Sequence, residues 1–428
     1  MKDFIKNFTE HPRVKQLGPG LITGAADDDP SGIATYSQAG AQFGYNMLWT
    51  VIVTYPLMVG IQMVSARLGC ITGKGLAANI KAVFPRYVLY GIVGLLLIAN
   101  TVNIAADIAA MGQALRLLVG GSAHVYSVTF GLLCLVLQVF LRYENYVRYL
   151  KWLTLALLSY VAVVFMVHVP WTTVLGKVAM PSLVLNHDTI VLIVGVFGTT
   201  ISPYLFFWQA AQEMEDLKAV SNANAGAGVL LPHAESVARQ HLRRIRWDTY
   251  LGMGFSNLIA FFIILSSAVT LHAAGITNIQ TSAEAAEALR PLGGPGTFLL
   301  FSLGIVGTGM LAVPVLAGSA AYAVTESFDW KTGLDMKVHE AREFYGIIAF
   351  ATVGGVLLNF TRLDPIRALL WSADINCVIA VPIMAVMMIL GADANVMGNF
   401  VIRSRLRKLG WLATAVMGAT VCAMFATM

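Results

Sequence analysis

Three consecutive aspartates, Asp27, Asp28 and Asp29, stand in the middle of an otherwise apolar segment and are followed directly by Pro30. Charge in the middle of a membrane helix costs about 2.5–3.5 kcal/mol per residue on insertion scales, so these acids predict a functional site. Proline removes a backbone donor and obstructs the preceding turn, which favours a break in the helix. Carboxylates at the negative end of a half-helix attract hard cations such as Mg²⁺, Ca²⁺ or Mn²⁺.

The three carboxylates cannot all face one ion, because successive helical residues are rotated by about 100°. Asp29 lies beside the expected unwound turn, so we expect it to contact the ion directly. We expect Asp28 or Asp27 to face an aqueous vestibule.

A second interruption falls in a later apolar segment, at Thr199-Thr200-Ile201-Ser202-Pro203. Unwound carbonyls around Thr199 would face a cation there. The polar side chains nearby are the hydroxyls of Thr200, Ser202 and Tyr204, with Gln209 about two turns toward the cytoplasm as an exit residue. Glu213, a further turn on, is expected at a solvated helix end.

Two other acids lie within apolar segments. Asp107 is either a lining residue or a structural partner for Asn103 or Arg116. Asp374, with Asn376 close by, is expected about 12 Å from the outer end of its helix, where it can touch the pathway. None of the eight histidines falls at an expected midplane, which disfavours a histidine proton relay.

These residues sit in a polytopic, all-α membrane protein. The chain has 428 residues, of which 57% are hydrophobic and 12% charged, and its mean hydropathy is +0.72. Soluble domains carry about a quarter charged residues. Apolar stretches long enough to cross a bilayer, about 20 residues each, occur at 17–41, 46–69, 88–118, 123–141, 149–169, 189–214, 247–273, 296–325, 344–360, 366–390 and 409–427.

The basic residues orient these eleven helices. With a cytoplasmic N-terminus, 23 of the 28 lysines and arginines fall on the cytoplasmic side and five on the other. Positive charge accumulates on the cytoplasmic side of membrane proteins, so we expect a multi-pass plasma-membrane protein and no nucleic-acid partner. The four cysteines show no paired spacing, so neither a zinc site nor a disulfide framework is expected.

The whole chain, 1–428, reads as a single transporter domain. It divides into a cytoplasmic N-terminus (1–16), helices 1–6 (17–214), a cytoplasmic loop (215–246) and helices 7–11 (247–428). Helices 1 and 6 are both interrupted near the midplane. Equivalent breaks are expected if helices 1–5 and 6–10 are inverted repeats with the substrate site between the broken helices.

Several motifs then resemble the Nramp family of divalent metal transporters. They are GPG–x9–DP, QAGAQFGYNMLW, SARLGCITGKGLA and AADIA, followed by G-T-T-x-x-P, RIRWDTYLGMGFSNLIAFF and GADANVMG. The match spans essentially the whole chain. It implies a LeuT-like fold in which helices 1 and 6 hold the ion.

The departures from the family pattern are informative. The family's Asp-Pro-Gly-Asn motif reads Asp29-Pro30-Ser31-Gly32 here, and its Met-Pro-His motif reads Ser202-Pro203-Tyr204. Gln209 stands at a second histidine position. The family's helix-3 Asp is kept as Asp107, but the acidic residue that the family has three positions later is replaced here by Ala110. The family's paired arginines of helix 9 have no counterpart in this chain. This pattern resembles the Nramp-related magnesium transporters.

We therefore expect a roomy oxygen site for a partly hydrated ion. The expected metal contacts are Asp29, Ala26, Thr199, Ser202, Asp28 and Gly32, and the expected pathway residues are Asp27, Thr200, Tyr204, Gln209, Asp107, Asp374 and Asn376. The expected function is transport of Mg²⁺ and Mn²⁺ by alternating access without proton coupling. The metal is then the substrate, no cofactor is required, and a monomer is compatible with this function.

The alternative is a proton-coupled Mn²⁺/Fe²⁺ importer. A Na⁺-coupled amino-acid carrier would bring its substrate carboxylate against three aspartates. An intramembrane aspartyl protease would require Asp29 and Asp107 to act as a pair, and the sequence contains no HExxH or GxSxG motif. The sequence therefore favours a transporter over an enzyme.

Overall fold

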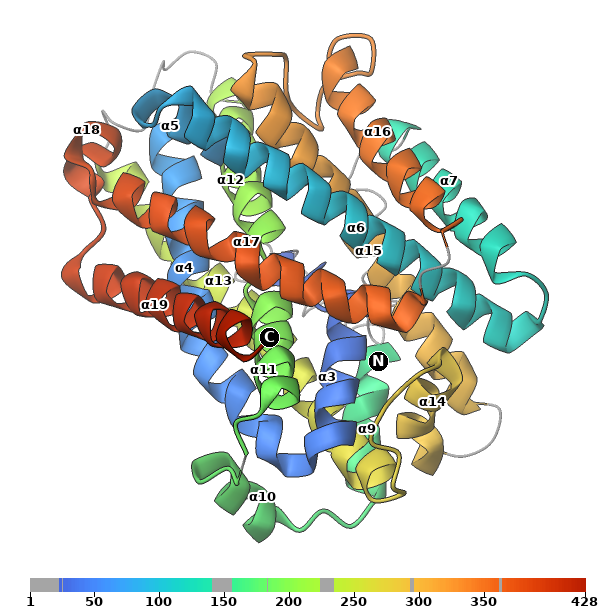
Figure 1. The fold of residues 1–428 in the computed structure, drawn as a ribbon. Coiled ribbons are helices and arrows are strands. Elements are labelled where there is room, and N and C mark those ends of the chain that lie inside the picture. The colour runs from blue at the N-terminus through green and yellow to red at the C-terminus, as the bar shows by residue number, and fades with distance from the viewer. Residues whose placement is uncertain are drawn as a thin grey trace, which may run out of the picture.

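The computed structural model describes residues 23–24, 26–140, 156–182, 184–223, 235–292, 296–361 and 364–428, which are predominantly helical (Figure 1). The expected N-terminal segment 1–16 lies outside these ranges. The principal helices are α3 (Pro30–Phe43), α4 (Leu48–Thr72), α6 (Arg86–Val119), α7 (Ala123–Phe140), α9 (Leu158–Met166), α11 (His187–Thr200), α12 (Pro203–Ala223), α13 (Glu235–Ser267), α15 (Gly296–Ser327), α16 (Arg342–Leu358), α17 (Pro365–Ala392) and α19 (Ser404–Thr427).

Shorter elements join them. These are the α-helices α5 (Leu76–Val83), α10 (Trp171–Ala179), α14 (Ser282–Ala286) and α18 (Ala394–Met397), the 3₁₀ turns Gly44–Met47, Glu287–Leu292 and Gly398–Phe400, and the π-helical turn Ala268–His272.

Eight segments of the described chain are long and apolar enough to span a bilayer. One of them, Pro30–Thr72, contains both α3 and α4, which correspond to the first two expected helices. The fifth expected helix is described only from residue 156, and α16, the ninth, has 17 residues. In the described ranges, a helix therefore lies at each of the eleven stretches expected from the sequence.

The boundary between helices 6 and 7 differs from the expected one. α12 continues to Ala223 and α13 already begins at Glu235, so both ends of the expected loop 215–246 are helical. The apolar runs end before these helices do, because a helix that leaves the bilayer can continue on polar residues.

Both expected breaks are present. Ala26 and Asp27 are helical, Asp28 and Asp29 are not, and α3 begins at Pro30. Asp29 is the N-cap of α3, and its Oδ1 accepts the Gly32 amide at 2.7 Å. Proline at the first helical position needs no donor, which together with the cap favours a helix start here.

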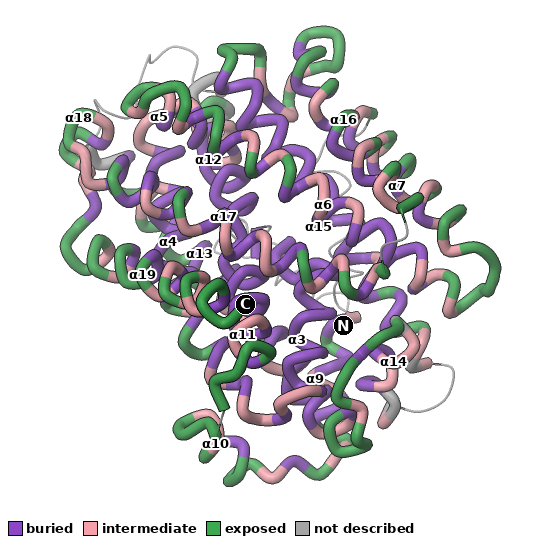
Figure 2. Tube along the Cα trace, viewed as in Figure 1, coloured by how far each residue is buried: buried purple, intermediate pink, exposed green. Residues whose placement is uncertain are grey.

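The second break separates α11 from α12, which follow one another through the centre of the molecule (Figure 1). α11 ends at Thr200 and α12 begins at Pro203, leaving Ile201 and Ser202 outside helical geometry. α3 packs against α11, α13 and α17, so the two breaks lie in the interior of the bundle. Most of α3 and α11 is accordingly coloured as buried in Figure 2.

The periphery is apolar as well as exposed. Phe140 is 78% exposed, and Phe350 and Leu412 on α16 and α19 are more than half exposed. Large exposed apolar side chains on long helices are expected where a protein faces lipid.

The inner half of the first helix lies directly against α13. A Cβ added to Gly24 would lie 2.3 Å from the carbonyl oxygen of Gly252. The two backbones can approach this closely because Gly24 has no side chain.

Candidate metal site

Asp29 lies at the centre of the molecule, between the two breaks. It is buried, and its second oxygen, Oδ2, accepts a hydrogen bond from the Tyr204 hydroxyl at 3.3 Å. The same hydroxyl is 3.2 Å from the carbonyl oxygen of Ala26. The Tyr204 hydroxyl of the second broken helix therefore contacts both the Asp29 carboxylate and a backbone carbonyl of the first broken helix.

The second break contributes backbone oxygens and hydroxyls. Ser202 donates its hydroxyl to the carbonyl oxygens of Thr199, at 2.9 Å, and Gly198, at 3.0 Å. Thr200 donates to its own helix and contacts the Tyr36 hydroxyl at 3.0 Å, which ties α11 to α3. The hydroxyl of Ser202 is thus directed into its own helix.

Gly32 faces the second break. A Cβ added there would lie 3.1 Å from Thr199 Oγ1 and 3.5 Å from Asp29 Oδ1. Of the expected metal contacts, Asp29, Ala26, Gly32, Thr199 and Ser202 therefore gather around the two breaks.

Asp27 and Asp28 differ from expectation. They are 0% and 1% exposed, so neither faces an aqueous vestibule. Both instead contact Ser256 of α13, whose Oγ is 2.7 Å from Asp27 Oδ2 and 3.0 Å from Asp28 Oδ1. Ser256 was not expected at the site, although a serine beside an asparagine in an apolar helix is a signal that could have indicated it.

Asp107 is also buried, and neither of its oxygens accepts a hydrogen bond of ordinary geometry. The groups that act on it electrostatically are the Asp29 carboxylate and the Ser31 amide. The expected partner Asn103 instead donates to Asn376 Oδ1 at 2.9 Å. Asp107 therefore lies on the central site rather than in a structural polar pair.

Asp374 lies on the same helix as Asn376, but it faces α11 rather than Asn103. A Cβ added to Gly195 of α11 would be 3.3 Å from Asp374 Oδ1. Asp374 is half-buried, beside the first half of the second broken helix.

On the expected cytoplasmic side, Gln209 is buried rather than open to an exit. Its Oε1 accepts Gln62 Nε2 at 2.6 Å, and its Nε2 donates to Thr249 Oγ1 at 3.4 Å. The expectation for Glu213 was wrong. This side chain is 1% exposed and is paired with Arg244 at 2.6 Å, because α13 extends further than the apolar pattern indicates and brings a basic residue alongside it.

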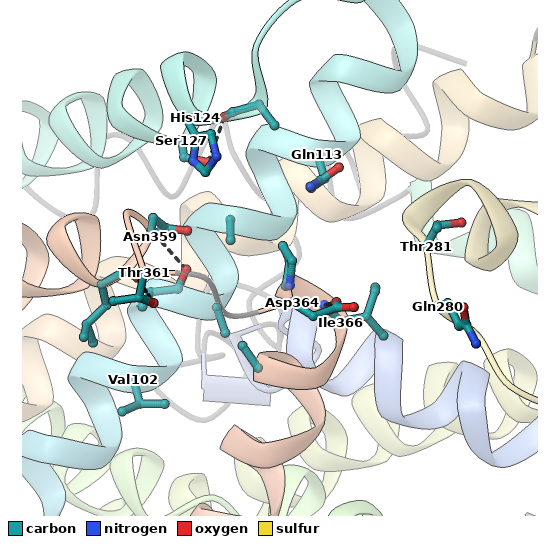
Figure 3. A pocket seen from close by; sticks show the side chains of 17 residues that line it. Val102, Gln113, His124, Ser127, Gln280, Thr281, Asn359, Thr361, Asp364 and Ile366 are labelled. Carbon is teal, nitrogen blue, oxygen red and sulfur yellow. Dashed lines mark hydrogen bonds between the residues drawn. The ribbon is translucent and has the colours of Figure 1, made fainter.

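A cavity of about 540 Å³ opens on the expected outer side (Figure 3). Its polar lining includes Gln113, His124, Ser127, Gln280, Thr281 and Asp364. These residues come from four separate regions of the chain that converge only in three dimensions, and none of them was expected as a pathway residue.

A small void adjoins this cavity, and Ile366 lines both. The void has a volume of about 10 Å³ and is also lined by Pro30, Ala110 and Leu369, so it is barely large enough for one water molecule. Ser31 donates to the carbonyl oxygen of Leu369 at 2.8 Å, which joins α3 to α17. Asp29 is buried, and the contacts between α3 and α17 and between the first helix and α13 enclose it.

No group of three or more His, Cys, Asp and Glu side chains suited to a metal ion occurs in the described ranges. The donor set around Asp29 instead consists of a carboxylate, backbone carbonyls and hydroxyls. Oxygen donors of this kind suit hard cations, and bound water would complete the coordination of a small ion.

Known proteins share this architecture. The chain is similar to the Eremococcus coleocola manganese transporter, solved in complex with an aromatic bis-isothiourea substituted compound, with 17% identity and a TM-score of 0.74 over 95% of this chain and 85% of that one. It is also similar to Mhp1, a nucleobase-cation-symport-1 family transporter, with 14% identity and a TM-score of 0.55 over 96% of this chain and 92% of that one. These likenesses show the LeuT-like fold.

The family follows from the sequence itself. The profile described as Natural resistance-associated macrophage protein-like matches residues 20–427, which include both breaks and every residue of the central site. The chain thus belongs to the Nramp family of multi-pass membrane transporters.

Proposed function

We propose that the protein transports Mg²⁺ and Mn²⁺ across the plasma membrane by alternating access, with the ion partly hydrated and without obligatory proton coupling. The proposal combines the family membership with the oxygen donors gathered at the two broken helices. The Eremococcus coleocola relative is a manganese transporter, which supports Mn²⁺ as one substrate.

The observation that carries the magnesium assignment is the pair Gly32 and Ser202. Gly32 supplies no side chain beside Asp29, and Ser202 donates its hydroxyl into its own helix. Neither position offers the sulfur or amide ligand that the family pattern leads us to expect. An ion held mainly by Asp29 must keep several waters, which suits Mg²⁺ because Mg²⁺ dehydrates reluctantly.

The absence of proton coupling is supported by the side chains at the second break. Tyr204 and Gln209 stand where the family pattern has histidines, and neither changes charge near neutral pH. Gln209 is held by Gln62 and Thr249 rather than by an ionisable group.

The membrane orientation follows from charge. The loops that carry most of the lysines and arginines, including 331–342 and 403–408, would face the cytoplasm with the N-terminus. The 540 Å³ cavity would then open to the outside and serve as the entrance.

The test is uptake into proteoliposomes that contain an internal pH dye. We expect Mn²⁺ uptake that Mg²⁺ inhibits competitively, with no metal-dependent acidification. Asp29→Ala should abolish uptake and weaken calorimetric Mn²⁺ binding at least about tenfold, about 1.4 kcal/mol. Glu343 provides a matched control, since Glu343→Gln removes an exposed carboxylate of α16, a helix that packs mainly against α6, α7 and α15. Unchanged binding in Asp29→Ala would overturn the site assignment, and failure of Mg²⁺ to compete would overturn the magnesium assignment.

One observation favours the second candidate, a proton-coupled Mn²⁺/Fe²⁺ importer. Asp107 is a buried carboxylate that accepts no hydrogen bond of ordinary geometry and interacts with Asp29, so it has a position from which it could exchange a proton. Acidification of the vesicle lumen during Mn²⁺ uptake, lost in Asp107→Asn, would establish this candidate instead.

A further inference from the structure

Asp27, Asp28 and Ser256 form an oxygen cluster that the central site does not use. The Ser256 Oγ lies 2.7 Å from Asp27 Oδ2 and 3.0 Å from Asp28 Oδ1. A serine hydroxyl has a single proton, so it can fully satisfy only one of the two carboxylates as a donor. Three oxygens, from the first broken helix and from α13, therefore converge, and the single serine proton cannot satisfy both carboxyl groups.

The other two oxygens of the pair have no partner at all. Asp27 Oδ1 and Asp28 Oδ2 are buried and make no hydrogen bond. The side chains that act on the two carboxylates are Ser256 and other aspartates, with no described lysine or arginine among them. Buried charge without a partner is strongly unfavourable, so this cluster either takes up protons or holds a positive ligand.

The charge of the whole region indicates what that ligand is. Asp29 and Asp107 interact with each other, and one divalent ion would neutralise them. In their ionised forms, Asp27 and Asp28 would then add two further negative charges in the protein interior. A second divalent ion would neutralise these as well.

We propose that Asp27, Asp28 and Ser256 form a second divalent-cation site on the inner side of Asp29, occupied together with the central site. The site takes a hard, partly hydrated ion, Mg²⁺ or Mn²⁺, because its ligands are two carboxylates and a hydroxyl and leave room for waters in the coordination shell. This inference rests on the proposed function. It gives the transported ion a second binding site between the central site and the cytoplasm. The two sites are adjacent, since the Cα atoms of Asp27 and Asp29 are at most about 7 Å apart.

The test counts bound ions on the purified full-length protein. Calorimetric and electron paramagnetic resonance titrations with Mn²⁺ should give two ions per chain for the wild type. The double variant Asp27→Asn/Asp28→Asn should bind one, and Asp29→Asn should also retain one. At saturation, the resonance lines of the wild type should be broadened by the neighbouring Mn²⁺ and should sharpen in both variants.

Ser256→Ala provides a variant that changes no charge. It should weaken the second binding event at least tenfold and leave the first unchanged. Ser266→Ala is the matched control, because Ser266 is a buried serine of the same helix that donates to the carbonyl oxygen of Ile263. If the double aspartate variant is not monodisperse on size exclusion, the comparison of these two serine variants decides the question.

The outcomes separate this inference from the proposed function. The second site would be overturned if the wild type bound one Mn²⁺ per chain, and if that ion were lost in Asp29→Asn but bound at full affinity in Ser256→Ala. This result would leave the transporter assignment unchanged. Absence of any Mn²⁺ or Mg²⁺ binding to the wild type would overturn the proposed function as well.

Discussion

At the scale of single residues, the central site is distinguished by Gly32 and Ser202, neither of which directs a side-chain ligand toward Asp29. Gly32 leaves space between Asp29 and Thr199, and Ser202 directs its hydroxyl back to Thr199. The Asp29 carboxylate accepts hydrogen bonds from the Gly32 amide and the Tyr204 hydroxyl, and that hydroxyl also contacts the Ala26 carbonyl oxygen. Selectivity should respond to changes at these few positions.

The double substitution Gly32→Asn/Ser202→Met should shift transport toward Mn²⁺. An amide oxygen and a thioether would replace waters around the ion, and sulfur favours transition metals over Mg²⁺. We expect the ratio of Mn²⁺ to Mg²⁺ affinity to rise at least about tenfold, about 1.4 kcal/mol, in competition uptake assays. Gly32→Ala is the control, because it adds the Cβ 3.1 Å from Thr199 Oγ1 but supplies no ligand. An unchanged ratio in the double variant would show that neither position contacts the ion.

Tyr204→Phe should weaken metal binding while preserving the fold. It removes a hydroxyl that lies 3.3 Å from Asp29 Oδ2 and 3.2 Å from the Ala26 carbonyl oxygen, and the buried ring remains packed. A hydrogen bond to a charged group contributes about 1.5–3 kcal/mol, so calorimetry should show at least about a tenfold weaker Kd. Tyr160→Phe, at another buried tyrosine, should bind metal like the wild type. Equal affinities for the two variants would remove Tyr204 from the site.

At the scale of elements, α12 and α13 are joined by one buried ion pair. Arg244 contacts Glu213 at 2.6 Å and Asp216 at 2.9 Å, and the Glu213 carboxylate is buried. Removing a partner from a buried pair leaves an uncompensated charge, which is more costly than the loss of a surface pair. Glu213 and Asp216 follow Gln209 on α12, so this pair joins the two helices at the end that we expect to face the cytoplasm.

Arg244→Gln should therefore destabilise the protein by about 2–3 kcal/mol, given that the arginine is a quarter exposed. Thermal unfolding monitored by fluorescence size exclusion should show the lower Tm. Glu213→Gln in the same chain should restore part of the loss, since both charges are then absent. Lys81→Gln breaks a pair whose aspartate, Asp329, is 80% exposed, and should cost less than about 1 kcal/mol. A Tm in Arg244→Gln equal to that in Lys81→Gln would contradict this interpretation.

The sequence was sufficient for the helices and the breaks but not for their contacts. Apolar runs located the helices, and Pro30 and Pro203 located the two interruptions. The contacts of Ser256 and Glu213 were missed, because a helix buried on several sides has no polar face from which its neighbours can be inferred. Which residue meets Asp27 depends on how α13 packs against the first helix, and that is a property of the tertiary structure.

At the scale of the whole molecule, the charge asymmetry predicts an orientation that labelling can test. In a Cys422→Ser background, Met180→Cys should react with a membrane-impermeant maleimide in intact cells, because Met180 is 81% exposed in an expected outer loop. Lys337→Cys, exposed in an expected inner loop, should react only after permeabilisation. The reverse pattern would invert the topology and turn the 540 Å³ cavity into an exit.

The contact between Gly24 and Gly252 constrains how this protein can evolve. A side chain at position 24 would meet the Gly252 carbonyl group within 2.3 Å, with no flexible atom to give way. In a library that samples every substitution, position 24 should therefore tolerate almost nothing, alanine included. The exposed apolar positions on α7 and α19 should accept most other apolar residues. Divergence among related sequences should accordingly accumulate at the lipid-facing surface and spare this glycine.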